Sequence, residues 1–190
     1  MAKVVFSTMM SLDGFFESRQ GKIDWVSIDE EIHRHANEEI RNTDLILLGR
    51  KLYETMRYWD TAETAPGLAD FEHEFAAIWN TKPKMVFSRT LKSVGPHARL
   101  AKEDFVAELE RLRLEGTGTI EVGGPTLAAV AMQLGLIDSY RMYIHPVLLG
   151  GGKASFGELQ RPAKLKLTET RAFKSGAVLL RYDRAEAANA

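Results

Sequence analysis

The sequence contains no cysteine, which excludes disulfides, thiolate metal sites and cysteine nucleophiles. It also lacks an excess of charge of either sign. Its formal net charge of -1 provides no overall field to attract nucleic acid or an anionic membrane. No uncharged run approaches the ~20 residues that cross a bilayer, and the N-terminus leads straight into a strand-like pattern. We therefore expect a cytoplasmic protein that acts on a small molecule, with no metal, nucleic-acid partner or membrane partner.

The 190 residues suit one domain with a substantial core, predicted at 1–184, followed by a frayed tail at 185–190. Apolar runs typical of buried strands alternate with helical stripes, which predicts an α/β fold with a mostly parallel central sheet and helices on both faces. The run 138–147 predicts an antiparallel strand with one face more exposed. A closing antiparallel hairpin is predicted at the C-terminal sheet edge. Strands are predicted at 3–10, 45–48, 85–87, 100–101 and 119–122, and helices at 29–41, from 50, from 71, from 105 and at 125–135.

The stretch Ile120–Thr126, Ile-Glu-Val-Gly-Gly-Pro-Thr, predicts a strand, a tight turn and a helix start. Gly123 and Gly124 allow close approach of a ligand to the backbone, and Pro125 suits the first helical turn. The helix N-terminus attracts negative charge, so this stretch is a candidate anion site. An ordinary strand-to-helix turn is the alternative.

Two other turns carry chemistry suited to phosphate. Gly49-Arg50-Lys51 follows the second predicted strand, and Ser88-Arg89-Thr90 follows the third. Arginine binds a phosphate monoester through two hydrogen bonds, and hydroxyls add neutral donors. Because ligands of doubly wound sheets bind at the carboxyl ends of the strands, these turns together predict one extended, phosphorylated ligand. Solvated polar turns remain the alternative for each.

Several other features have two interpretations. The long loop 12–24 is interpreted as a binding loop, because three nearby aromatic residues argue against a disordered one. The run Gly150–Gly152 is either a flexible turn or a place where something packs against main chain. His145 is either a functional base or a structural histidine. His33 and His35 are predicted to be solvated and too differently directed to share a metal ion.

Four segments in this order resemble the dihydrofolate reductase superfamily: Ser11–Gly14, Leu48–Lys51, Phe87–Thr90 and His145–Gly152. The similarity is greatest to the branch related to the C-terminal reductase domain of the bifunctional riboflavin-biosynthesis deaminase-reductase, and it extends from Lys3 to Tyr182. It implies a three-layer dihydrofolate-reductase-like fold. It also implies hydride transfer from NADPH to a C=N or C=O carbon of a small pteridine-like or pyrimidine-like heterocycle. A homodimer through the hairpin edge is a further expectation from the family.

The resemblance also implies the site residues. Asp29, with Glu30 next, matches the acidic residue that grips the substrate, although a helix cap is the alternative for Asp29. The loop 12–24 would close over the nicotinamide, and the 2′-phosphate of NADPH would lie at Ser88 and Arg89, near Arg50. The implied cofactor-binding residues are Thr8, Met9, Asp13, Gly49, Arg50, Lys51, Ser88, Arg89, Gly123, Gly124, Pro125, Thr126 and Leu127.

The sequence departs from both family patterns. Val122 stands where riboflavin-pathway reductases usually carry glutamate, and Glu121 would face the other side of the sheet. Their Thr-Ser and Ser-Arg pattern is absent from 24–29, which argues against a ribosylaminopyrimidine phosphate substrate. Leu52 replaces the hydroxyl residue of dihydrofolate reductases. A noncatalytic nucleotide-binding or sensory protein is therefore the second hypothesis, and a structural oligomer module is the third.

Overall fold

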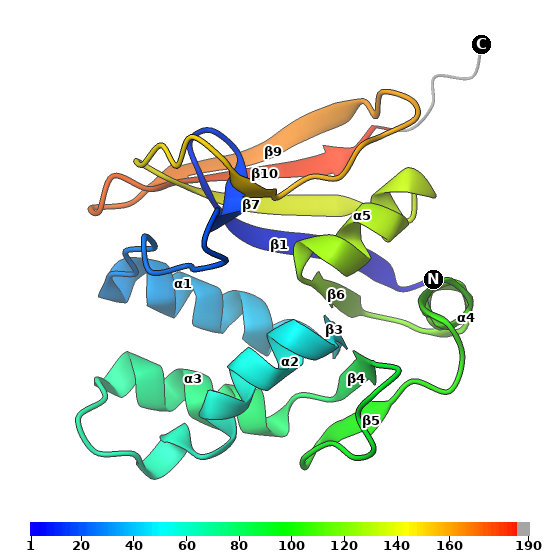
Figure 1. Cartoon of the computed structure of the whole chain (residues 1–190), viewed down its shortest axis with the longest axis horizontal. Helices are drawn as coiled ribbons and strands as arrows, with labels where there is room; N and C mark the ends of the chain where they lie inside the picture. Colours follow the sequence, from blue (N-terminus) through cyan, green and yellow to red (C-terminus); the bar gives the residue numbers. More distant parts are fainter. Residues whose placement is uncertain (186–190) are drawn as a thin grey trace.

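The computed structural model describes residues 1–185, and its centre is an eight-stranded sheet in the order β5-β4-β3-β6-β1-β7-β10-β9 (Figure 1). The strands from β5 to β7 are parallel, and β10 and β9 are antiparallel to their neighbours. The sheet strands are β1 (Lys3–Ser11), β3 (Leu45–Gly49), β4 (Lys84–Phe87), β5 (Ala98–Leu100), β6 (Thr119–Gly123), β7 (Ser139–His145), β9 (Leu165–Ala172) and β10 (Val178–Arg184).

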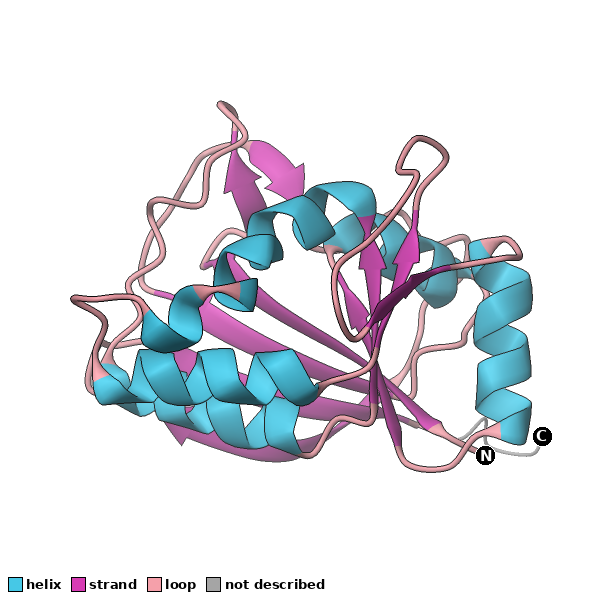
Figure 2. Cartoon of the chain, turned by 90° about the horizontal axis from the view of Figure 1, so that it is seen from below, coloured by secondary structure: helices cyan, strands magenta, loops and turns pink. Residues whose placement is uncertain are grey.

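Helices cover both faces of this sheet. Alternate residues of β3 show the division: Leu47 packs toward α4 (Phe105–Glu115) and α5 (Pro125–Gln133), whereas Ile46 and Leu48 pack toward α2 (Arg50–Met56) and α3 (Asp70–Thr81). The helix α1 (Glu30–Arg41) lies beside α3, and Figure 2 shows the two helices running together across the strands. Two 3-10 turns, η1 (Arg57–Asp60) and η2 (Ala62–Thr64), lead from α2 to α3. The predicted α/β fold with its C-terminal hairpin is confirmed.

The prediction for 138–147 was wrong in part. The strand β7 is antiparallel to β10, but it is parallel to β1, with Phe6 opposite Tyr140 and Ser11 opposite His145. Both of its faces are buried, so the alternation of polar and apolar residues does not mark a solvent face. The polar side chain of Arg141 is accommodated inside because Glu39 pairs with it at 2.7 Å.

The loop 12–24 contains a short strand, β2 (Phe15–Ser18), which pairs with β8 (Gly152–Ala154). Of the glycine run, Gly152 packs against main chain, whereas Gly151 lies against the Arg19 side chain. A Cβ atom on Gly152 would lie 1.9 Å from the carbonyl oxygen of Glu17, which no side chain could accommodate.

The histidines of α1 are half-buried, so the prediction that they are solvated was wrong. The His33 ring packs edge-on against Phe75, with 5.6 Å between ring centroids. The His35 ring faces β7, and its Nδ1 lies 2.8 Å from the Tyr143 hydroxyl. Tertiary neighbours on two different elements cover these positions, which the sequence spacing does not reveal.

Within the described residues, no helix is both long and apolar enough to cross a membrane. Of the predicted tail, Ala185 donates its N–H to the Lys164 carbonyl at 3.0 Å. The remainder, 186–190, lies outside the described residues.

Candidate functional site

A cleft of about 500 Å³ opens at the carboxyl ends of β3, β4 and β6. Its floor and walls come from segments far apart in the sequence. The β3–α2 junction contributes Gly49, Arg50, Lys51, Leu52 and Thr55, and the β6–α5 junction contributes Gly123, Gly124, Pro125, Thr126 and Leu127. Phe87 comes from the end of β4, while Phe16, Glu17, Gly21, Ile23 and Lys153 come from the β2–β8 side. This volume is in the range typical of small-molecule and cofactor sites.

The cleft combines positive charge with apolar walls. Arg50, Lys51 and Lys153 line it, against one carboxylate, Glu17. The Arg50 guanidinium lies 3.0 Å from Glu54, and both side chains are substantially exposed. Such a surface pair is weak enough for an anion to compete for the guanidinium.

The glycines at the cleft serve two different purposes. A Cβ on Gly123 would lie 2.7 Å from Leu48 Cδ2 and 3.2 Å from the Leu47 carbonyl oxygen, so the packing of β6 against β3 itself favours glycine there. Gly124 has a φ of 86°, a conformation that favours glycine, and it turns the chain into α5. A Cβ on Gly49, by contrast, would meet nothing closer than Leu127 at 3.8 Å. Gly49 therefore leaves space in the cleft that the fold does not need.

Five of the predicted cofactor residues lie outside the cleft lining, and three of them, Thr8, Met9 and Asp13, lie in the second half of β1 or just after it. Thr8 is buried in the sheet, and Met9 packs against the cluster around Ile32 and Tyr143. Asp13 ties two loops together, because its carboxylate accepts the Leu149 N–H at 3.1 Å and the Gly150 N–H at 2.7 Å. The Ser11 hydroxyl and these N–H groups lower the pKa of Asp13.

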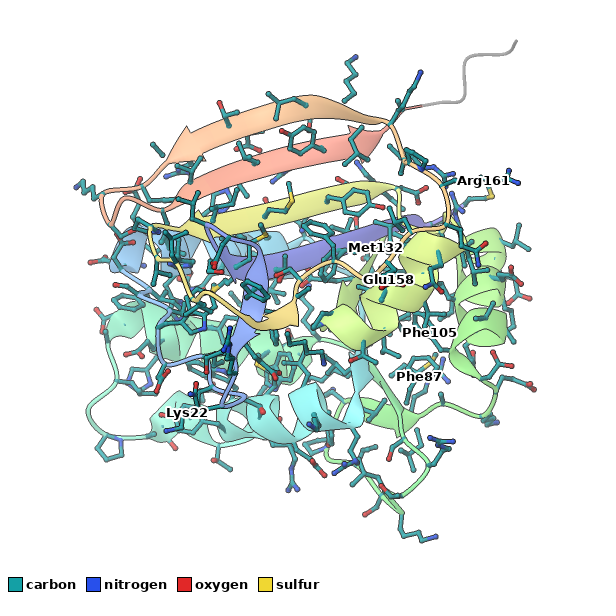
Figure 3. The ribbon with its side chains drawn as sticks, turned by 45° about the horizontal axis from the view of Figure 1, so that its top comes forward. Lys22, Phe87, Phe105, Met132, Glu158 and Arg161 are labelled. Carbon is teal, nitrogen blue, oxygen red and sulfur yellow. The ribbon has the colours of Figure 1, made fainter. Side chains whose placement is uncertain are left out.

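The turn at Ser88 and Arg89 adjoins the cleft without lining it. Phe87, which precedes the turn, is a cleft residue, and its ring packs edge-on against Phe105 with 5.2 Å between centroids (Figure 3). The Ser88 hydroxyl accepts N–H groups of Thr90 and Leu91 and so holds the turn. The Arg89 side chain is exposed.

The two predicted acidic residues lie at the start of α1, away from the cleft lining. Asp29 is the N-cap: its Oδ1 accepts the Ile32 N–H at 2.8 Å and its Oδ2 accepts the Ser175 N–H at 3.1 Å. These hydrogen bonds, that of Ile32 first, lower the pKa of Asp29 and favour the ionised carboxylate. Glu30 is exposed and pairs with Arg34 at 2.8 Å. Asp29 therefore has the hydrogen bond of a helix N-cap, which was the alternative predicted for it.

His145 forms a separate polar group at the end of β7. Its side chain is 2 % exposed, and neither ring nitrogen has a hydrogen-bond partner among the described residues. The Trp25 ring covers it edge-on at 5.7 Å between centroids. Burial lowers the pKa of His145, while the charge of Asp29 opposes this shift. The imidazole therefore stays neutral near neutral pH.

The cleft residues of β2 and its loop lie within the predicted binding loop 12–24, but sequence reasoning named none of them singly as a site residue and missed Lys153 on β8. Lys153 is the most informative of them, because its ammonium donates to the Thr126 hydroxyl at 2.8 Å across the cleft. The sequence feature that could have indicated Lys153 is its position directly after Gly150–Gly152. The pairing of β8 with β2, which brings Lys153 to the cleft, has no local signature in the sequence.

The fold and the cleft define an α/β domain with a mostly parallel sheet, whose candidate ligand site lies at the carboxyl ends of the strands. The family model described as RibD C-terminal domain matches residues 2–179, and the chain belongs to this family. Its relatives include the uncharacterized protein YyaP of Bacillus subtilis (strain 168). The two are 31% identical over 181 residues, which cover 95% of this chain and 94% of YyaP.

Solved structures have the same fold. A putative riboflavin biosynthesis protein from Shewanella sp. PV-4 aligns with a TM-score of 0.72 and 23% identity, covering 98% of this chain and 100% of that one. A diaminohydroxyphosphoribosylaminopyrimidine deaminase/5-amino-6-(5-phosphoribosylamino)uracil reductase from Thermotoga maritima aligns with a TM-score of 0.68 and 15% identity. This chain is covered over 97% of its length and spans 57% of the Thermotoga protein. The suspected relationship to riboflavin-pathway reductase domains is confirmed.

Proposed function

We propose that the protein is an NADPH-dependent oxidoreductase that reduces a C=N or C=O bond of a small heterocycle, pteridine-like or pyrimidine-like. The observation that carries the proposal is the cleft at the strand ends. Three cationic side chains and apolar walls line it, and the absence of a side chain at Gly49 leaves space in it. The reductase activity in the Thermotoga protein's name, which concerns a substituted uracil, supports the choice of a heterocycle.

The cleft residues fit an extended, phosphorylated dinucleotide. Arg50 and Lys51 would hold phosphate oxygens, and the first turn of α5 supplies N–H groups without intrahelical partners. Phe16 and Leu127 provide apolar surface for the rings. NADPH supplies a hydride when bound. The chain's own residues bind and orient the reactants and exclude water.

In this proposal Arg50 and Arg89 would contact the 2′-phosphate of NADPH. The protein would therefore prefer NADPH to NADH. Binding would stabilise the fold by ~2.7 kcal/mol at a hundredfold excess of ligand over its dissociation constant. Thermal unfolding measured with increasing NADPH or NADH tests this. We expect a preference for NADPH that disappears in Arg50→Ala or Arg89→Ala and persists in Arg161→Ala, a change outside the cleft lining. Equal stabilisation by both nucleotides would refute the 2′-phosphate assignment.

A noncatalytic nucleotide-binding or sensory protein is the second candidate. The favouring observation is Asp29, whose two carboxylate oxygens are already occupied by N–H groups of α1 and the β9–β10 turn. An assay that follows the absorbance of the reduced nicotinamide distinguishes the oxidoreductase from the noncatalytic protein. It uses a panel of heterocycles that includes dihydrofolate. Turnover lost in Asp29→Asn, whose amide oxygen can still accept the Ile32 N–H of the cap, supports the enzyme. NADPH binding without turnover, unaffected by Asp29→Asn, supports the second candidate.

A further inference from the structure

Lys153 reaches the cleft from a part of the chain that the phosphate-binding turns do not include. It lies on β8, and its Nζ donates to the Thr126 Oγ1 at 2.8 Å. Thr126 is in the first turn of α5, next to Gly124 and Pro125. Lys153 therefore faces the β6–α5 junction from the opposite side of the cleft.

The segment that carries Lys153 is held in place by several independent contacts. β8 pairs with β2, and Gly152 passes so close to the Glu17 carbonyl that only glycine fits. Asp13 accepts the N–H groups of Leu149 and Gly150, and the Arg19 guanidinium donates to the Gly150 carbonyl at 2.8 Å. We call residues 149–154 the strap. The contacts of the strap hold the Lys153 backbone in a fixed position beside the cleft.

The ammonium of Lys153 donates to a neutral partner, the Thr126 hydroxyl. Throughout residues 1–185 its ammonium forms no ion pair, whereas the Arg50 guanidinium on the facing wall has Glu54. A hydroxyl is a weaker partner for an ammonium than a phosphate oxygen, because only the phosphate adds the attraction between opposite charges. An anion beside Thr126 would therefore take over the Lys153 contact.

We propose that Lys153 is a phosphate-binding residue that secures the strap over a phosphorylated ligand in the cleft. The inference rests on the proposed function, since the dinucleotide's phosphates are the ligand groups it would bind. Binding at Lys153 joins the ligand to β8, and through β8 to the loop 12–24. Phosphate binding would then add to the contacts that hold the strap and the loop in place.

The test compares the wild type with Lys153→Met, which keeps an unbranched apolar stem but removes the charge. Lys166→Met on the exposed strand β9 makes the same charge change away from the cleft and serves as the control. We expect Lys153→Met to weaken NADPH binding at least about tenfold in calorimetric titration, with no change in the free protein's melting temperature. Lys153→Arg should restore most of the affinity, and Lys166→Met should bind as the wild type does.

A second readout follows the strap itself. Amide hydrogen exchange at 15–18 and 152–154 should slow when NADPH binds the wild type and should slow much less in Lys153→Met. Affinity for NADPH that is the same in Lys153→Met and the wild type would overturn the inference and leave the proposed function intact.

Titration with inorganic pyrophosphate distinguishes failure of the proposed function from failure of the inference about Lys153. If the wild type does not bind NADPH but binds pyrophosphate in a manner that depends on Lys153, the proposed cofactor is wrong and the phosphate contact stands. If the wild type binds neither probe, both proposals fail.

Discussion

Glu121→Gln should stabilise the protein at neutral and alkaline pH. Glu121 lies on β6, on the face of the sheet that α1 covers, with its side chain 12% exposed and its Oε2 buried, and the charged groups of Arg141 and Glu39 act on it. The nearest cation is Arg141, whose Nη1 is 3.8 Å from Glu121 Oε2 but only 2.7 Å from Glu39. Arg181 also pairs with Glu39. Glu121 thus shares a buried guanidinium that another carboxylate holds more closely.

Burial raises the pKa of Glu121 from 4.5 to about 7, against the opposing attraction of Arg141. The folded state therefore holds this proton more tightly than the unfolded chain does. The stabilisation by the proton is fully present below the unfolded pKa and is lost as pH rises through the folded pKa. At 1.36 kcal/mol for each pKa unit, ionised Glu121 costs the fold about 3 kcal/mol above pH 7.

Glutamine resembles the protonated side chain and does not ionise. We expect Glu121→Gln and the wild type to have similar free energies of unfolding near pH 4.5, with the variant gaining by about 3 kcal/mol by pH 8. That gain corresponds to roughly 6–12 °C in melting temperature for a chain of this size. Urea unfolding across this pH range measures the difference directly, and acid protonation of the other carboxylates affects both proteins equally.

Glu115→Gln is the matched control. Glu115 is exposed and pairs with Arg111 at 3.0 Å, so its replacement should change stability by no more than about 0.5 kcal/mol at any pH tested. A Glu121→Gln variant that is no more stable than the wild type at pH 8, or whose advantage does not change with pH, would refute the reasoning about the buried carboxylate.

Other changes test the glycines and the helix cap. Gly49→Ala should change stability by no more than about 1 kcal/mol, because its φ of -75° suits alanine whereas alanine is a poorer N-cap than glycine. NADPH binding should weaken, and unchanged affinity in the same titration would argue against backbone contact there. Gly152→Ala should destabilise by about 1–3 kcal/mol in urea unfolding, since its Cβ would meet Glu17 and its φ is 144°; a neutral effect would contradict the close strap geometry. Asp29→Ala should cost about 1 kcal/mol and Asp29→Asn less, since the amide oxygen can still accept the Ile32 N–H, and equal losses would show that this cap contact contributes nothing.

Local chemistry in the sequence was sufficient for much of the fold. Runs of apolar residues such as 45–48 predicted buried strands, and Pro125 after two glycines predicted the start of α5, because these signals depend on neighbouring residues alone. The same local signals placed Gly49–Lys51 and Gly123–Leu127 at strand ends. The parallel sheet then brought these segments to one cleft.

Long-range pairing decided the rest. The direction of β7 depends on its position between β1 and β10, and its burial depends on helices from other parts of the chain. Asp29 reaches the N–H of Ser175, and Lys153 reaches Thr126, only after the chain has folded. A residue's type and its spacing specify which side chains are available for chemistry. The free energy of packing distant segments together determines which of them meet, and the sequence by itself carries no local signal for those contacts.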